Sequence, residues 1–383
     1  MRGRLLLHGE LVVGELSLVG DRIGQVDRAT GKIADEASLP VIAPGLIDLH
    51  VHGFGGHDPL DDLAGMARSL ALAGTTGFQP TLFPRDPSLL GEDVSAVDRQ
   101  AEAVAGQAGR ARPLGIHLEG PFLNPDAAGA IPVDDLALPS VASLGAILGK
   151  ATGAGRGVRR MTVAPELSGS ADLVRELLRS GVQVSLGHSR TSARDARTAL
   201  AQGATTVTHL FNAMGPLHHR EVGLAGVALT DGAAFAEIIG DLIHVGRDAF
   251  ELALAARGPA GLCLVSDALK GAGTGCDAFH WHGREHVVRD KTAYYPAAGE
   301  GGEPQLAGSA CSQLEMVRTL TGAGVVGLAD ALVMATGTPA RALGLDGEVG
   351  VLCSGARADL IVLKGEGLEL AEVWVAGQRC HPA

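Results

Sequence analysis

The sequence has 383 residues, of which 46% are hydrophobic and 19% are charged, and this composition excludes a disordered chain. No uninterrupted apolar stretch reaches the roughly 18 residues of a membrane span, and the net charge of −12 argues against nucleic acid or a membrane surface as a partner. The five cysteines form no CxxC pair, and the first residues lack the apolar segment of a secretion signal, so we expect a cytoplasmic protein.

Short strand-like runs, separated by Gly and Asp, occur at both ends of the chain. They fall within residues 4–42 at the N-terminal end and at 359–363 and 372–375 near the C-terminal end. We therefore expect residues 1–43 and 350–383 to build one small β-sandwich-like domain together.

Between these ends, apolar strand-like runs alternate with helical segments, which is typical of a parallel sheet buried on both faces. Eight runs each followed by a helical segment predict an α/β fold, a closed (β/α)₈ TIM barrel over residues 44–349, with an open doubly wound sheet as the alternative. The runs are 46–51, 76–83, 114–118, 161–164, 182–186, 206–211, 235–239 and 262–265.

Polar side chains follow the carboxyl ends of seven of these runs. Barrel enzymes gather their chemistry on that face, whereas an open sheet gathers it near one switch point, so this distribution favours the barrel. The residues are His50, His52, Glu119, Glu166, His188, His209, Asp241 and Asp267.

Five of these residues are candidate metal ligands. His50 and His52 alternate along a strand, so their side chains share a face about 6.6 Å apart. Glu119 ends an apolar run where an ionised carboxylate needs a partner, and His188 and His209 each end a further run. The alternatives are histidines bonded to the backbone in the core and a salt bridge at Glu119.

Other polar positions have separate interpretations. Asp267 ends an apolar run where its carboxylate suits a general acid/base, the alternative being a helix cap. His117 is expected behind the ligands or in the core. The second HxHG motif, at 280–283, lies among polar residues and predicts an exposed hairpin or lid and not a metal site. His218 and His219 lie in a loop, where substrate contact is the expected role.

Several motifs together resemble the amidohydrolase superfamily and, within it, the N-acetylglucosamine-6-phosphate deacetylase family, over nearly the whole chain. They are PGLIDLHVHG from Pro44, GIHLEGPFLNP from Gly115, VAPE from Val163, SLGHS from Ser185, THLFNAM from Thr208, HHRE from His218, VSDA from Val265, LAGS from Leu306, ATGTPARALGL from Ala335 and GARADLIVL ending at Leu363.

The resemblance implies a metal-dependent hydrolase that converts N-acetylglucosamine 6-phosphate into glucosamine 6-phosphate and acetate. It implies a divalent metal held by Glu119, His188 and His209, with Asp267 as the catalytic acid/base. Zinc or iron is expected first, with manganese or cobalt as alternatives. A second ion at His50 and His52, bridged by Glu119, leaves open whether one or two ions bind.

The resemblance also implies a substrate-binding set. Arg220 of one subunit is expected to bind the phosphate of a substrate in the site of the neighbouring subunit, which implies a homodimer. The substrate-binding residues are Ala130, Asn212, Ala213, His219, Arg220, His244, Leu306, Ala307 and Gly308.

Two positions depart from the family pattern on the substrate side. Ile131 stands where members often carry His or Gln, and Leu242 stands where Gly is usual. These changes keep two alternatives open: the same chemistry on another N-acyl hexosamine phosphate or a cyclic amide, and a non-catalytic sugar-phosphate-binding homologue.

Overall fold

The computed structural model describes residues 1–30, 36–149, 157–296 and 304–381. Its main sheet is parallel and nearly closed, in the order β13-β12-β11-β10-β9-β8-β6-β5, with the short β7 (Arg112–Pro113) paired to β6. This arrangement confirms the predicted (β/α)₈ barrel. The strands are β5 (Leu46–Val51), β6 (Thr75–Leu82), β8 (Ile116–Glu119), β9 (Val158–Val163), β10 (Gln183–Leu186), β11 (Thr206–Val207), β12 (Phe235–Ile239) and β13 (Leu262–Val265).

The first and last barrel strands, β5 and β13, are joined by a few separate backbone hydrogen bonds and by the side chain of Gln313. The Asp267 amide donates to the His50 carbonyl at 2.9 Å. The buried Gln313 amide nitrogen donates to the carbonyls of Ile47 and Leu264 at 2.8 and 2.7 Å. These bonds occupy backbone carbonyls that a complete ladder would otherwise satisfy, so the ring closes without a full β5–β13 pairing.

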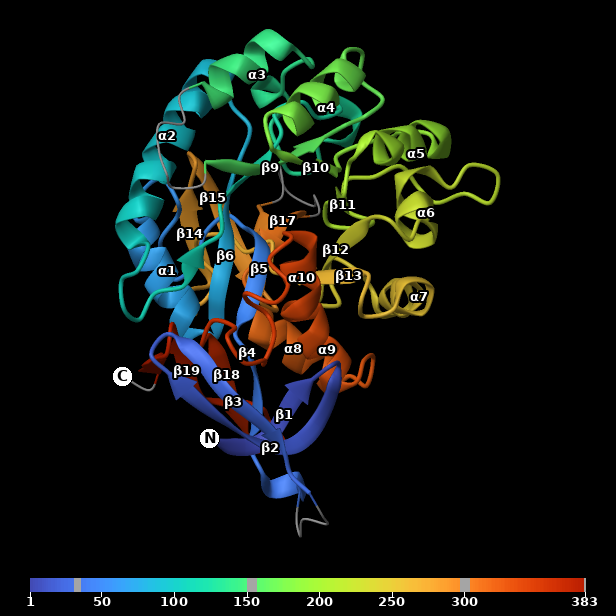
Figure 1. Ribbon diagram of the computed structural model, residues 1–383. Coiled ribbons are helices and arrows are strands. Elements are labelled where there is room, and N and C mark those ends of the chain that lie inside the picture. The colour runs from blue at the N-terminus through green and yellow to red at the C-terminus, as the bar shows by residue number, and fades with distance from the viewer. Residues whose placement is uncertain (31–35, 150–156, 297–303, 382–383) are drawn as a thin grey trace.

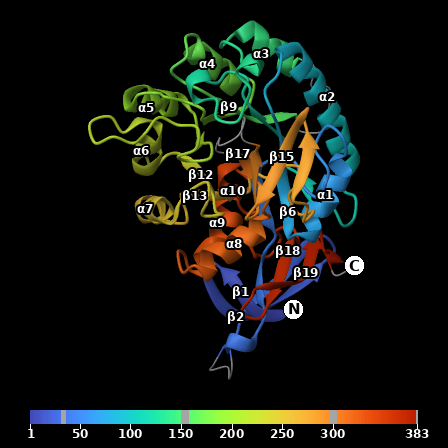
Figure 2. The same cartoon turned by 180° about the vertical axis from the view of Figure 1, so that it is seen from behind.

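Helices surround the barrel on its outside (Figures 1 and 2). Several begin at polar caps, such as Ser192 before α5 and the Ser312–Glu315 capping box before α8. Within the described ranges, no helix is both long enough and apolar enough to cross a membrane. The helices are α1 (Leu63–Leu72), α2 (Pro87–Val104), α3 (Val141–Leu148), α4 (Ser170–Arg179), α5 (Ala193–Gln202), α6 (Gly223–Thr230), α7 (Arg247–Arg257), α8 (Gln313–Gly322), α9 (Leu328–Ala335) and α10 (Gly337–Ala342).

The two chain ends form one mixed sheet at the end of the molecule opposite α3 and α4 (Figure 1). Strand β4 pairs with β1 in parallel and with β18 antiparallel, which joins the N-terminal strands to the C-terminal ones. Leu5, Ile42 and Leu360 are buried in a small cluster on this sheet. In sheet order the strands are β20 (Gln378–His381), β19 (Glu369–Val375), β18 (Leu360–Lys364), β4 (Val41–Pro44), β1 (Arg2–Leu7), β2 (Glu10–Val19) and β3 (Arg22–Arg28).

A third sheet follows the last barrel strand. It is antiparallel and consists of β14 (Ala278–Trp281), β15 (Arg284–Arg289), β16 (Thr292–Tyr295) and β17 (Gln305–Ser309). The second HxHG motif lies on its first hairpin, as predicted. The expectation of a solvated ribbon holds for the exposed His280 and is wrong for Trp281, whose side chain is buried.

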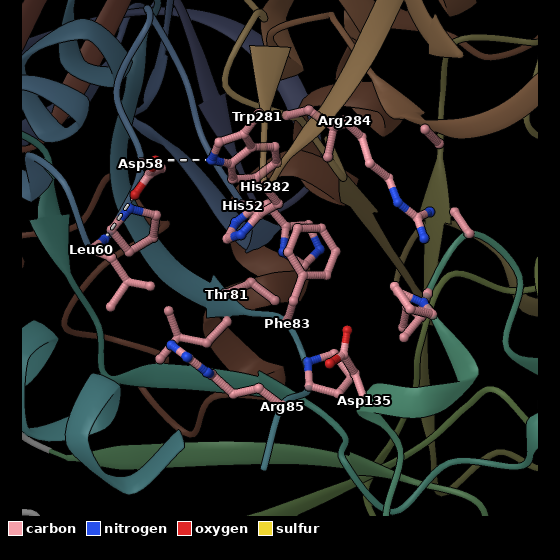
Figure 3. A pocket seen from close by; sticks show the side chains of 18 of the residues that line it. His52, Asp58, Leu60, Thr81, Phe83, Arg85, Asp135, Trp281, His282 and Arg284 are labelled. Carbon is pink, nitrogen blue, oxygen red and sulfur yellow. Dashed lines mark hydrogen bonds between the residues drawn. The ribbon is translucent and has the colours of Figure 1, made fainter. Parts of the chain in front are cut away.

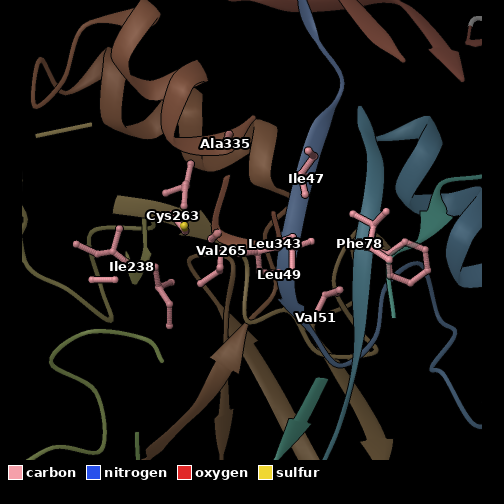
Figure 4. Packing of buried hydrophobic residues seen from close by; sticks show 14 of the residues in the cluster. Ile47, Leu49, Val51, Phe78, Ile238, Cys263, Val265, Ala335 and Leu343 are labelled. Atoms are coloured by element: carbon pink, nitrogen blue, oxygen red, sulfur yellow. The ribbon is translucent and has the colours of Figure 1, made fainter. Parts of the chain in front are cut away.

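One barrel strand is shorter than predicted. The run 206–211 forms a strand only at Thr206–Val207, because His209 and Phe211 adopt positive φ angles of 27° and 77° that turn the chain. Apolar side chains such as Leu49, Ile238 and Val265 are buried in one large cluster that joins the barrel strands to the surrounding helices (Figure 4). The polar candidate residues lie at the carboxyl ends of the strands.

Candidate metal centre and substrate cavity

Glu119, at the end of β8, lies between the two histidines that follow β10 and β11. Its Oε1 is 3.0 Å from Nε2 of His188 and 3.0 Å from Nε2 of His209. The two Nε2 atoms are themselves 3.0 Å apart, and all three side chains are buried. Three potential donor atoms therefore converge on one point.

The HxH motif on β5 lies on the other side of the same carboxylate. Glu119 Oε2 is 3.3 Å from His52 Nε2, and Glu119 Oε1 is 3.4 Å from His50 Nε2. The two imidazole Nε2 atoms are 3.1 Å apart. Gly53 completes the motif because a Cβ there would lie 2.8 Å from the backbone of Lys270, so the loop can approach only at glycine. Glu119 is thus shared by two groups of donors.

The chemistry of these donors fits a divalent cation. Burial opposes charge on Glu119, yet the surrounding imidazoles hold the pKa of its carboxyl well below the usual range. Burial likewise favours neutral His50, but Glu119 and Asp267 raise the pKa of His50 well above its ordinary value. The buried carboxylates therefore require positive charge beside them, which a cation bound by imidazole and carboxylate supplies.

Asp267 lies at the open side of this cluster. Its Oδ1 is 3.5 Å from Nε2 of both His50 and His52, and its side chain is 15% exposed, more than the ligand candidates. Burial raises the energy of the carboxylate, but His50 and His52 lower the pKa of Asp267 below its ordinary value. Asp267 is therefore ionised and able to accept a proton.

The backbone is unusual where three of these residues leave their strands. His188, His209 and Asp267 have φ angles of 47°, 27° and 48°. Non-glycine residues adopt this left-handed region only at a cost of about 1–3 kcal/mol, and such strain is concentrated at functional sites. The turn directs each side chain toward the centre of the barrel mouth.

A buried ion pair supports the HxH motif from below. Glu237, in the middle of β12, accepts a hydrogen bond from His50 Nδ1 at 3.1 Å, which leaves Nε2 of His50 as the ligand atom. The other Glu237 oxygen, Oε1, forms an ion pair with Nη1 of Arg160 on β9 at 2.6 Å. The angle between the groups does not meet the geometry of a hydrogen bond, and neither atom has another hydrogen-bond partner. Both side chains have no exposed surface. Neither residue was among the predicted site residues, although a Glu inside the apolar run 235–239 is a signal of a buried charge that needs a partner.

Two other contacts orient the histidines of the mouth. His188 Nδ1 lies 2.9 Å from the carbonyl oxygen of Ala127, so Nε2 faces Glu119. His117 lies behind His50, with its Nε2 2.8 Å from Thr162 Oγ1, and burial together with Arg160 holds the pKa of His117 well below its ordinary value. His117 is thus buried behind the candidate ligands, as the sequence predicted. One ring nitrogen of His117 also lies close enough to His50 and Glu237 for the three side chains to hold a metal ion together.

A cavity of about 190 Å³ opens in front of the metal centre. His244 contributes Nε2, which is buried without a hydrogen-bond partner, while its Nδ1 lies 2.6 Å from Asp241 Oδ2. Seven of the nine predicted substrate-binding residues line this cavity: Ala130, Asn212, Ala213, His244, Leu306, Ala307 and Gly308.

The remaining two predicted substrate-binding residues lie elsewhere. His219 and Arg220 are exposed on the loop after β11, where Arg220 Nη1 lies 3.1 Å from His219 Nε2, and neither residue lines the cavity of its own chain. Within the part of the chain that the structure describes, His280 and His282 belong to no group able to hold a metal.

The whole chain is similar to a family of known enzymes. A model of the Amidohydrolase family matches residues 41–380. The chain is 33% identical to the N-acetylglucosamine-6-phosphate deacetylase of Homo sapiens, over 98% of this chain and 93% of that protein. It is 32% identical to the N-acetylgalactosamine-6-phosphate deacetylase of Escherichia coli O157:H7, over 90% of this chain and 88% of that protein. A solved structure of a mutant N-acetyl-D-glucosamine-6-phosphate deacetylase from Mycobacterium smegmatis, in complex with N-acetyl-D-glucosamine-6-phosphate, matches with a TM-score of 0.87 and 29% identity, covering 99% of this chain and 98% of that one.

Proposed function

Because the chain belongs to the amidohydrolase family, we propose that it hydrolyses the N-acetyl amide of N-acetylglucosamine 6-phosphate to glucosamine 6-phosphate and acetate. The observation that carries this proposal is the convergence of Glu119, His188 and His209 within 3.0 Å, with Asp267 beside them, in a chain that matches such deacetylases over nearly its full length.

Glu119, His188 and His209 would hold the first divalent ion, and His50, His52 and Asp267 would hold a second one that shares Glu119. When bound, such a cation lowers the pKa of water and polarises an amide carbonyl. Imidazole and carboxylate ligands suit zinc and iron first, and manganese and cobalt as well. Counting bound metal per chain by elemental analysis separates the one-ion proposal from the two-ion proposal.

Asp267 would move the proton during hydrolysis. Its ionised carboxylate accepts a proton from the attacking water and then donates it to the amide nitrogen, because an amine cannot leave as an anion. The position of Asp267 supports this role, since its side chain is the most exposed of those around Glu119 and lines the cavity.

His244 would position the substrate from the opposite wall. Burial favours the neutral ring, but Asp241 raises the pKa of His244, and its unpartnered Nε2 is available to donate to a substrate oxygen. Asn212 and Ala213 line the same cavity. Together these residues would fix the sugar while the amide faces the metal centre.

Arg220 would bind the phosphate of a substrate held by the other subunit of a homodimer. Its exposed guanidinium has no acidic partner among the ion pairs of the described residues and matches phosphate geometry. Mixing Arg220→Ala subunits with Asp267→Asn subunits tests this. Sharing of sites between subunits restores part of the activity, whereas sites built within one chain leave the mixture inactive.

A second candidate substrate is N-acetylgalactosamine 6-phosphate, the epimer on which the Escherichia coli relative is named to act. The two unusual residues, Ile131 and Leu242, favour keeping it as an alternative, since Ile131 lines the cavity. An assay with metal-loaded protein decides between these substrates. It measures amine release from each sugar phosphate, from unphosphorylated sugars and from a cyclic amide. Binding of N-acetylglucosamine 6-phosphate without any amine release would refute the proposed hydrolysis in favour of a sugar-phosphate-binding homologue.

A further inference from the structure

A second cavity of about 310 Å³ lies beside the first, on the side of β6 and the β14–β15 hairpin (Figure 3). Its size is at the lower end of ligand sites, which span about 300–1,000 Å³. Five residues line both cavities, so the second cavity adjoins the one in front of the metal centre. They are His52, Phe83, Ala130, Ile131 and Ala307.

The wall of this second cavity is aromatic and apolar. The Phe83 ring stacks on His52 with ring centroids 3.8 Å apart, and the Trp281 ring lies 5.5 Å from Phe83. Leu60 and Leu269 complete the lining of this part of the cavity. No function proposed above uses Phe83, Trp281 or either leucine.

Three charged residues of the lining, Asp58, Arg85 and Asp93, have partners of opposite charge. Asp58 accepts hydrogen bonds from Trp281 Nε1 at 2.9 Å and from Lys270 Nζ at 3.2 Å, and Arg85 donates to Asp93 at 2.8 Å. The exposed Arg284 lies 5.0 Å from the centre of the Tyr295 ring, and Asp135 adds an opposite charge.

Two histidines of the lining are neutral at physiological pH. Burial lowers the pKa of both His282 and His286 below the ordinary value. Beside the reacting centre, these neutral imidazoles and the rings of Phe83 and Trp281 give the cavity an aromatic part, while Arg284 and Asp135 add charge elsewhere in the lining.

The geometry of an amide relates this cavity to the substrate. A secondary amide is planar and trans, so the sugar on its nitrogen and the chain on its carbonyl carbon point in opposite directions. Of the proposed substrate-binding residues in the first cavity, Asn212, Ala213 and His244 do not line the second cavity, whereas Ala130 and Ala307 line both. With the sugar against Asn212, Ala213 and His244, the acyl chain would point past His52 and Phe83.

We propose that the second cavity binds an apolar N-acyl chain longer than acetyl, so that the enzyme hydrolyses N-acyl glucosamine 6-phosphates with chains of several carbons. This inference rests on the proposed function. Water adds its oxygen to the acyl carbon, the C–N bond breaks, and the nitrogen takes the proton. The products are glucosamine 6-phosphate and the matching carboxylic acid.

The first measurement compares N-acetyl, N-butyryl and N-hexanoyl glucosamine 6-phosphate with metal-loaded wild-type enzyme. Burial of each methylene favours binding about fourfold, so we expect kcat/KM for the hexanoyl substrate to equal or exceed that for the acetyl substrate. Hydrolysis of the acetyl substrate with a hexanoyl rate at least 100-fold lower would overturn the inference and leave the proposed function intact. If no substrate releases amine, both proposals fail.

The second measurement fills the cavity. Leu60 lines only the second cavity and is half-buried, so Leu60→Trp should narrow it without disturbing the core. We expect kcat/KM for the hexanoyl substrate to fall at least tenfold and that for the acetyl substrate to stay within twofold. The matched control is Leu138→Trp, at a side chain that is 78% exposed and lines neither cavity, where both rates should stay unchanged. Equal losses on both substrates in Leu60→Trp would refute the assignment. Should Leu60→Trp fail to fold, the wild-type chain-length series decides alone.

Discussion

Replacing Glu237 by glutamine should separate two roles of one buried carboxylate. Burial opposes its charge, but Arg160 and His50 lower the pKa of Glu237 below the ordinary value, so the native side chain is ionised. Glutamine keeps the shape and removes the charge. Arg160 then has no exposed surface and no charged partner, and His50 loses the carboxylate that holds its Nδ1 at 3.1 Å.

The size of each effect follows from these contacts. Breaking a fully buried ion pair by removing one partner costs about 3–5 kcal/mol of folding free energy, so Glu237→Gln should be strongly destabilised. Loss of a residue that orients a metal ligand weakens metal affinity about 10–100-fold, or about 1.4–2.7 kcal/mol. The loss should be largest for the ion held by His50 and His52, because His188 is oriented by a backbone carbonyl that the change leaves in place. Glu237 also accepts a bond of 3.4 Å from the His209 backbone N–H, which a glutamine oxygen can still accept.

The double variant Arg160→Met/Glu237→Gln is the control that separates folding from metal binding. It removes both charges, so its free energy of unfolding in EDTA should recover part of the loss, measured by urea titration followed by circular dichroism. Its metal affinity should stay weakened, measured by competition with a fluorescent zinc chelator. Equal stability of the single and double variants, or native zinc affinity in the double variant, would refute this account of Glu237.

Three further predictions concern other parts of the chain. Asp267→Asn should lower kcat about 100- to 10,000-fold and leave one metal ion bound, measured by amine release and elemental analysis of the same sample; near-native turnover would remove Asp267 from proton transfer. Glu315→Ala should cost about 1 kcal/mol by removing half of the capping box of α8. Burial raises the pKa of Glu315, but hydrogen bonds from Lys291 and Ser312 lower it below its ordinary value. The loss of stability, measured as a shift of the urea midpoint, should therefore be present at pH 7 and shrink as the pH falls through the folded pKa; a loss that stays constant from pH 7 down to acid unfolding would contradict this account. Burial raises the pKa of Cys263 far above its ordinary value and that of Cys311 to about 12, so a thiol reagent at pH 8 should leave both unmodified until the protein unfolds, and labelling of either one in the native enzyme would be the contrary result.

The sequence by itself determined the barrel and most of the residues at its mouth. Strand runs are local patterns of apolar residues, and parallel strands necessarily bring their carboxyl ends to one face. His50, Glu119 and His209 therefore could be placed together from three separate segments before any contact was known, and the structure places Nε2 of His50 and of His209 at 3.4 and 3.0 Å from the Glu119 carboxylate.

Only the tertiary structure decided what supports the site and what lies beside it. Glu237 contacts His50 across 187 residues, and Trp281 contacts Asp58 across 223, so no local pattern links either pair. The positive φ at His209, just after β11 ends at Val207, likewise depends on the surrounding packing. A polar side chain in an apolar run can contact the barrel interior, a ligand or a partner charge. Burial makes each unpaired charge costly, so its partner must come from another strand. Which strand supplies that partner is decided only when distant strands come together in the fold.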